Sequence, residues 1–260
     1  MLDALLKGPA AYSARTGWPA WAVIPAALGI LTLAALVGVL VAWGYSSVTG
    51  LGFPTGNAAS GTLPPQAMLQ VATWTAGLQI GIVLLTLLAA AFFSSNRAEV
   101  LALRPPAQGW HVLGLALIPL FAVTTVWTAL LMFMKPEAAL HDLRPFKDML
   151  HSDAFWLMLT VIGIGAPLSE ELLFRGFLFS GLAKSKLGLV GAGVLTSLLW
   201  TLLHLGYSIF GLIEVMSIGL YFAWLLARTG SLWVTMFCHA VYNTVMALGI
   251  YFVSLPPPAG

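Results

Sequence analysis

Residues 154–183 read AFWLMLTVIGIGAPLSEELLFRGFLFSGLA. Apart from Glu170, Glu171 and Arg175, the stretch carries no charge. An α-helix needs about 20 predominantly apolar residues to cross the roughly 30 Å hydrocarbon core of a bilayer. This stretch is long enough to cross. A charge within lipid is costly and usually faces a partner or a water-filled cavity. Residues 154–183 therefore predict a transmembrane helix that carries a polar site.

Six further apolar runs have the length of a membrane crossing. They cover residues 18–45, 68–93, 110–134, 187–206, 208–227 and 232–253. Irregular backbone exposed to lipid is not tolerated, so each run predicts a helix. With residues 154–183 counted as one helix or two, we expect an all-α polytopic transmembrane bundle of about 7–8 membrane-spanning helices. Residues 135–153 mix both charges with two prolines and predict a short interfacial helix.

The composition excludes several classes of protein. Hydrophobic residues make up 60% of the chain and charged residues 8%, against roughly 45–50% and 25% in soluble domains. A net charge of +2 is too small for a nucleic-acid partner. The single cysteine, Cys238, excludes an intramolecular disulfide and a multi-cysteine metal cage. We expect one integral-membrane domain over residues 1–260, in the cell (inner) membrane if the source is bacterial.

The charged residues of the 154–183 stretch fall into two groups. Glu171 and Arg175 are four residues apart, lie on one helix face and are expected to form a structural ion pair. Glu170 points about 100° away and has no such partner in its own helix. Counted back from Lys184 at about 1.5 Å per residue, it lies roughly 21 Å along the helix. We therefore expect Glu170 to be functional.

Two later spans carry histidines. His204 follows Trp200 by one helical turn, and His239 and Asn243 are also one turn apart. Taken singly, these side chains are as well explained by hydrogen bonds between helices. If their helices are neighbours of the one that carries Glu170, one cavity collects a carboxylate, two imidazoles and an amide. Such a set provides a base, an orienting group and donors for a developing oxyanion.

These segments resemble the CPBP family, also called the CAAX protease or ABI family. Its motifs are Glu-Glu-x-x-x-Arg, Phe-x-x-x-His and His-x-x-x-Asn, and all three occur here in order within residues 154–243, the predicted catalytic core. The chain departs from the pattern at Trp200, where the second motif usually has Phe. This departure affects the shape of the pocket more than its chemistry.

The resemblance, closest to the type II CAAX prenyl endopeptidases, implies an intramembrane endopeptidase acting on a membrane-associated peptide or protein among the membrane lipids. Glu170 and His204 would activate water, and His239 and Asn243 would stabilise the oxyanion. The residues implied to support these four are Glu171, Arg175 and Trp200.

The resemblance leaves the cofactor open, since members of the family are often described as metalloproteases. Glu170, His204 and His239 would make a two-His, one-Glu shell for zinc. Against zinc, the chain has no His-Glu-x-x-His motif, and Asn243 is a poor zinc ligand but a good oxyanion donor. We expect glutamate catalysis without a cofactor.

Two other functions compete with proteolysis. Members of the family also occur as non-catalytic membrane scaffolds or bacteriocin-immunity-type proteins, and in that case substitutions at Glu170, His204 and His239 would leave the phenotype intact. A small-molecule or proton-coupled transporter ranks last, because such folds pair interrupted helices in two corresponding halves and the sequence shows one interrupted helix.

Overall fold

The computed structural model describes residues 8–50, 65–94 and 96–254, and every regular element in these ranges is a helix. Six helices are long and apolar enough to cross a membrane. They are α2 (Ala20–Thr49), α3 (Pro65–Ala91), α5 (Val112–Met134), the continuous helix Phe155–Ala183, α11 (Ile209–Thr229) and α12 (Leu232–Phe252). The chain is a multi-pass integral membrane protein, and the predicted all-α bundle is confirmed.

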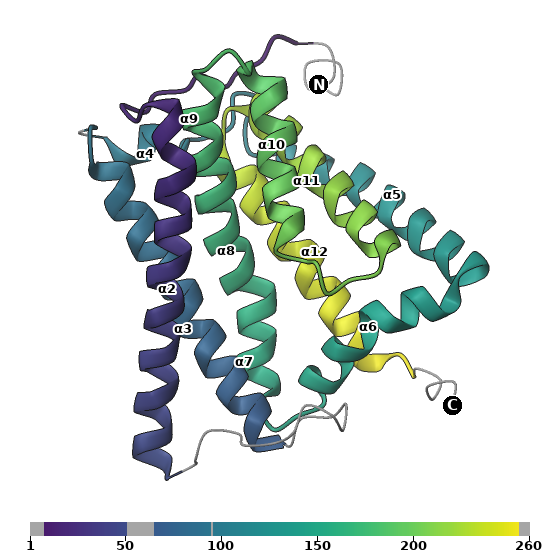
Figure 1. The fold of residues 1–260 in the computed structure, drawn as a ribbon. Helices are drawn as coiled ribbons and strands as arrows, with labels where there is room; N and C mark the ends of the chain where they lie inside the picture. Colours follow the sequence, from purple (N-terminus) through teal and green to yellow (C-terminus); the bar gives the residue numbers. More distant parts are fainter. Residues whose placement is uncertain (1–7, 51–64, 95, 255–260) are drawn as a thin grey trace.

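The helices α2 and α3 form a pair along one side of the bundle, and α5 lies on the opposite side (Figure 1). Small residues let the pair approach closely. A Cβ atom at Gly77 would lie 3.0 Å from the Cα of Gly38, and one at Gly81 would lie 2.9 Å from the Cα of Ala34. Close backbone approach is the main source of helix association where both surfaces are as apolar as lipid.

The helix predicted over residues 154–183 is one continuous rod in the middle of the bundle (Figure 1). It consists of α7 (Phe155–Thr160), the π-helical segment η2 (Val161–Gly165), α8 (Ala166–Glu170), the π-helical segment η3 (Glu171–Leu178) and α9 (Phe179–Ala183). Pro167 has no backbone N–H to donate and sits just after η2, where the wider helix accommodates it. The rod therefore makes a single crossing, with Glu170 at the junction between α8 and η3.

The run at residues 187–206 forms a shorter helix than its apolar length predicts. The helix α10 (Gly188–Leu202) ends at Leu202, so it falls below the length of a full crossing. Residues 203–208 are a non-helical connection to α11. The sequence predicted that His204 lies within a helix. His204 instead lies in this connection. Non-helical backbone at membrane depth is tolerated where it lines a cavity, and this connection does so.

A helix is present within residues 135–153 as predicted, namely α6 (Pro136–Leu150), which follows α5 directly. A four-residue helix, α4 (Arg97–Val100), lies between α3 and α5. The helix α6 packs against α5, α11 and α12. Its polar residues contact the ends of two of these helices, and its inner face forms part of the wall of the candidate site.

Candidate active site

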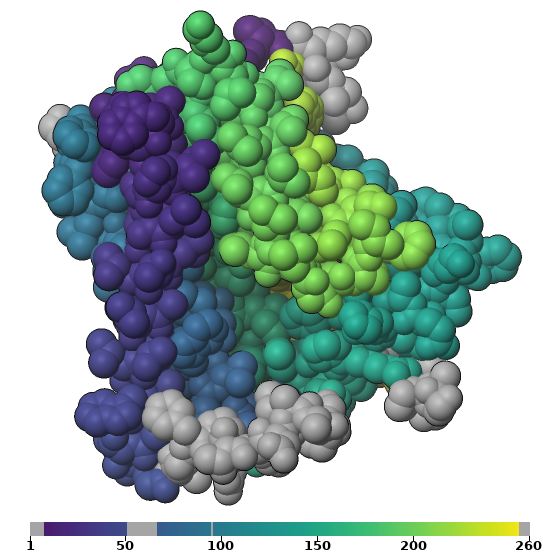
Figure 2. All heavy atoms as spheres, in the orientation of Figure 1, coloured from purple at the N-terminus to yellow at the C-terminus, as the bar shows by residue number. Residues whose placement is uncertain are grey.

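A cavity of about 520 Å³ lies between the central rod and α3, α6, α11 and α12. On the face that Figure 2 shows, the surface is hollowed between the α2–α3 pair and the α10–α11 region. The cavity walls are mostly apolar, and they include Glu170, His204, His239 and Asn243. The helices that carry these residues are therefore neighbours, and the four side chains meet at one cavity.

Glu170 is half-buried and has a partner on another helix. Its Oε2 accepts a hydrogen bond of 2.6 Å from the indole Nε1 of Trp200. The sequence showed no partner for Glu170 within its own helix, and it indicated Trp200 as a supporting residue without indicating this bond. The indole is buried, at 3% exposure, so this charge-assisted bond fixes the carboxylate at the cavity wall.

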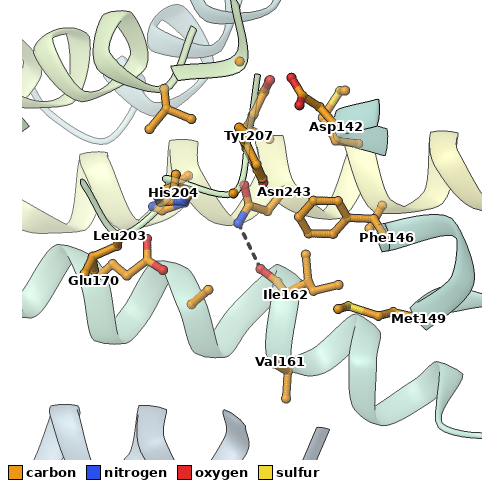
Figure 3. A pocket seen from close by; sticks show the side chains of 18 of the residues that line it. Asp142, Phe146, Met149, Val161, Ile162, Glu170, Leu203, His204, Tyr207 and Asn243 are labelled. Atoms are coloured by element: carbon orange, nitrogen blue, oxygen red, sulfur yellow. Dashed lines mark hydrogen bonds between the residues drawn. The ribbon is translucent and has the colours of Figure 1, made fainter. Parts of the chain in front are cut away.

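His204 is oriented by the same residue. Its Nδ1 lies 3.1 Å from the backbone oxygen of Trp200. Because a carbonyl oxygen can only accept, Nδ1 carries the hydrogen, and in the neutral ring Nε2 is left as an acceptor. The ring packs edge-on against Trp200 and Tyr207. Figure 3 shows the Glu170 carboxylate and the His204 ring pointing toward one another at the cavity.

A buried ionic cluster lies next to Trp200, the residue that binds both Glu170 and His204. Arg175 donates to Glu171 at 3.0 Å, and both side chains have no exposed surface, so the predicted ion pair is present. His239 joins it, with Nδ1 3.1 Å from Glu171 Oε1, a contact that the sequence did not indicate. The Arg175 guanidinium lies 4.4 Å from the Trp200 ring centroid. Since a carboxylate only accepts, Glu171 orients His239 and leaves Nε2 as the free ring nitrogen.

Asn243 contacts the central rod. Its Nδ2 donates to the backbone oxygen of Ile162 at 3.0 Å, as Figure 3 shows. From the other side, Gln79 of α3 donates to the oxygen of Val161 at 3.1 Å. Two carboxamides thus bind neighbouring carbonyls of η2. One amide hydrogen of Asn243 is engaged in this way, and the second remains for a ligand.

Other polar residues of the cavity were not predicted as site residues. Asp142 of α6 lines it, although nothing in the amphipathic sequence of that helix marks it out. Glu214 also lines it and accepts a hydrogen bond of 3.1 Å from Tyr242, and its charge within an apolar run was the available signal.

The donor set does not fit a catalytic zinc in this arrangement. Within the described ranges, no three His, Cys, Asp or Glu side chains are placed so that they could hold a metal ion. Glu170, His204 and His239 line one cavity, but Trp200 holds the first two and Glu171 holds the third. No step of the mechanism below therefore passes through a metal.

Comparisons with known proteins match the part of the chain that builds this cavity. A sequence model of the Rce1-like type II CAAX prenyl endopeptidases matches residues 152–245. A Bacillus subtilis protein named "Putative membrane peptidase YdiL" is 33% identical over 92 residues, which cover 35% of this chain and 36% of that protein. The UPF0177 protein YxdF of Lactococcus lactis is 28% identical over 101 residues, which cover 37% of this chain and 54% of that protein.

The resemblance noted in the sequence is confirmed over this segment. The chain spans about a third and about half of the lengths of these two relatives. No solved structure matches the chain significantly. The matched segment includes Glu170, His204, His239 and Asn243, but it excludes α3 and α6, which supply further parts of the cavity wall.

Proposed function

We propose that this protein is an intramembrane endopeptidase that hydrolyses a peptide bond near the membrane, with water activated by Glu170 and His204. One observation carries the proposal. Trp200 binds both residues, Glu170 through its indole N–H at 2.6 Å and His204 through its backbone oxygen at 3.1 Å, at the wall of a shared cavity. The similarity of residues 152–245 to a peptidase family supports a membrane peptidase.

The reaction assigns separate tasks to the two residues. The Glu170 carboxylate accepts a proton from a water molecule, and His204 Nε2 accepts the second water hydrogen in a hydrogen bond that orients the molecule. The water oxygen then bonds to the carbonyl carbon of the peptide. When the C–N bond breaks, the proton held by Glu170 passes to the leaving nitrogen, which gives a free amine and a new carboxylic acid.

Two further side chains of the cavity wall would stabilise the oxyanion that forms in this step. We assign this role to the second amide hydrogen of Asn243 and to the doubly protonated ring of His239, in which Nε2 also carries a hydrogen to donate. Both side chains are held by contacts on their far sides, His239 by Glu171 at 3.1 Å and Asn243 by Ile162 at 3.0 Å. Donors fixed before the reaction contribute more than mobile ones, and one such donor is worth about 10²–10³ in kcat.

The family description suggests the first substrate to test. It names CAAX prenyl endopeptidases, and an apolar cavity within the bilayer suits a peptide held at the membrane by a lipid. A farnesylated peptide with a C-terminal CAAX sequence is therefore the first probe, with its non-prenylated twin beside it. We propose that hydrolysis needs no bound metal.

The test uses purified protein in proteoliposomes with both probes and identifies the products by mass spectrometry. We expect wild-type protein to cleave at least one probe, and Glu170→Gln to lose at least about a hundredfold in rate, since general base catalysis contributes about 10²–10⁴. Glu137→Gln, on the exposed side of α6, is the matched control.

Each of three outcomes would contradict a part of the proposal. Near-normal turnover by Glu170→Gln would remove its catalytic base. The non-catalytic scaffold would be favoured if wild-type protein cleaves neither probe and cells that express only the Glu170→Gln chain behave like wild-type cells. Activity that a chelator abolishes and zinc restores would replace the metal-free step.

A further inference from the structure

The helix α6 holds the start of α11 through one carboxylate. Asp142 Oδ1 accepts from the backbone N–H of Ser208 at 2.6 Å, and Oδ2 accepts from the Ser208 hydroxyl at 2.6 Å. Ser208 is the N-cap of α11, and its hydroxyl oxygen also accepts from the N–H of Gly211 at 3.2 Å. A negative charge at a helix N-terminus is favourable because the N–H groups and the helix dipole face it. His141 Nδ1 lies 3.0 Å from the same carboxylate.

Gly211 shows how closely the carboxylate approaches α11. A Cβ atom built on Gly211 would collide with Asp142 Oδ2. A glycine inside a helix ordinarily costs stability relative to alanine. At this position the missing side chain leaves the space that the carboxylate occupies, so the contact depends on a residue of each helix.

The helix α6 also binds the C-terminal end of α12. Lys147 Nζ donates to the backbone oxygens of Ile250 and Tyr251 at 3.1 Å each, and to that of Val253. A positive charge at a helix C-terminus complements the dipole there. Asp142 thus binds the N-terminus of α11, and Lys147 binds the C-terminus of its antiparallel neighbour α12. We call this pair of contacts the α6 clasp.

The connection that carries His204 lies between α10 and the Asp142 contact. At its first end the backbone N–H of His204 donates to Thr201 at 2.9 Å, and within it Tyr207 donates to the oxygen of His204 at 2.9 Å. At its second end Ser208 is bound by Asp142. Residues 203–208 form no helix between these two points. The position of the His204 ring therefore depends on both ends of the connection.

We propose that Asp142 is a positioning residue, which holds residues 203–208 through the α6 clasp so that His204 faces Glu170. This inference rests on the proposed function for its kinetic consequence, but the clasp itself is testable without a substrate. Asp142 lies outside the segment that matches the peptidase family. The site therefore extends to a helix that the motifs do not include.

The structural arm of the test measures the mobility of the connection. Leu205 is 67% exposed and Cys238 is fully buried, so a Cys238→Ala, Leu205→Cys chain accepts one spin label on the connection. We expect an immobilised spectrum in otherwise wild-type protein and a mobile component in Asp142→Ala. Asp142→Asn keeps one acceptor for the Ser208 N–H and should lie between the two.

Glycine variants supply the matched comparison. Gly211→Ala keeps every charge and improves helix propensity, yet its methyl group displaces the carboxylate, so we expect the mobile component again. Gly114→Ala on α5 meets no atom within 4 Å and should leave the label as it is in wild-type protein. Immobilised labels in both Asp142→Ala and Gly211→Ala would overturn the proposal.

The kinetic arm follows cleavage of the farnesylated CAAX peptide by the unlabelled variants. A positioning role predicts at least a tenfold loss of kcat in Asp142→Ala, a KM within about threefold of wild type and partial rescue by Asp142→Asn. A mobile label with unchanged kcat would also contradict the proposal. If wild-type protein cleaves neither this peptide nor its non-prenylated twin, the proposed function fails, and the spin-label result still decides whether the clasp exists.

Discussion

Trp200 is the residue on which the geometry of the proposed water-activating pair depends. Trp200→Phe removes the indole donor to Glu170, at 2.6 Å, and keeps a ring beneath Arg175 and the backbone oxygen that binds His204. A hydrogen bond to a charged group is worth about 1.5–3 kcal/mol. We expect about a tenfold lower kcat, because the motif of the family usually has Phe at this position and tolerates the loss.

The measurement for Trp200→Phe is kcat with the cleavable probe, with Trp200→Ala beside it. The alanine variant also loses the ring under Arg175, at 4.4 Å, and should be much less active. Equal activity of the two variants would show that the ring under Arg175 contributes nothing to the rate.

Arg175 tests the buried cluster. Arg175→Met leaves the fully buried carboxylate of Glu171 with His239 as its remaining ionisable partner. Breaking a buried ion pair at one partner costs about 3–5 kcal/mol, whereas replacing both with apolar groups is often neutral. We expect a large drop in the detergent-solubilised melting temperature for Arg175→Met and substantial recovery in Glu171→Gln, Arg175→Met.

If the double variant is as unstable as Arg175→Met, the loss comes from packing of the arginine and not from an uncompensated charge. Activity should stay low in the double variant even where stability returns. Gln in place of Glu171 loses the carboxylate that orients His239.

Sequence spacing predicted some site residues and missed others for physical reasons. Glu171 and Arg175 share a helix, so four-residue spacing alone placed them in contact. The bond from Trp200 to Glu170 joins two helices, and no spacing within one helix indicates it. Asp142 lies in a helix that mixes polar and apolar residues, where a carboxylate is ordinarily solvated.

At the scale of elements, η2 is held by carboxamides from both sides, and this allows two roles of Asn243 to be separated. Gln79→Leu and Asn243→Leu each remove one bond to a neighbouring carbonyl of η2. Such bonds in membrane proteins are worth about 0.6 kcal/mol on average and up to about 1.7. We expect similar, modest losses of thermal stability from the two substitutions.

Their effects on activity should differ. If Asn243 also stabilises the oxyanion, Asn243→Leu loses about 10²–10³ in kcat. Gln79→Leu removes only a support of η2, so its kcat should fall much less. Parallel kinetic measurements on the two variants decide the matter, and equal losses would reduce Asn243 to a structural support.

The helix α10 shows where apolar length misleads. Residues 187–206 are apolar enough to cross, yet the helix ends at Leu202 because the chain beyond it lines a cavity and does not face lipid alone. Hydropathy reports that a segment is within the membrane, and it does not report whether protein or lipid surrounds the backbone. The position of His204 outside a helix follows from this difference.

At the scale of the whole molecule, the α2–α3 pair tests how the bundle is held together. Gly81→Leu would bring a large side chain against Ala34, whose Cα lies 2.9 Å from a Cβ atom at that glycine. Overpacking of this kind costs about 1–3 kcal/mol. Gly114→Leu, which points into open space, is the control, and thermal unfolding in the same detergent is the measurement. Equal melting temperatures would mean that the pair separates freely.

The bundle could be predicted from hydropathy because lipid requires each crossing to satisfy its own backbone. The order of the helices around the cavity could not, since apolar faces carry no code for their neighbours. The motifs supplied that information in part. They indicated that the rod, α10 and α12 meet, and they gave no sign that α3 and α6 complete the wall.

The most direct test of the central claim compares kcat/KM for wild type, Glu170→Gln, His204→Gln and the double variant in one proteoliposome preparation. If both residues act on one water molecule, each single variant loses at least about a hundredfold, and the double variant is little worse than the poorer single one. Near-wild-type turnover in either single variant, or losses that multiply in the double variant, would contradict the shared water.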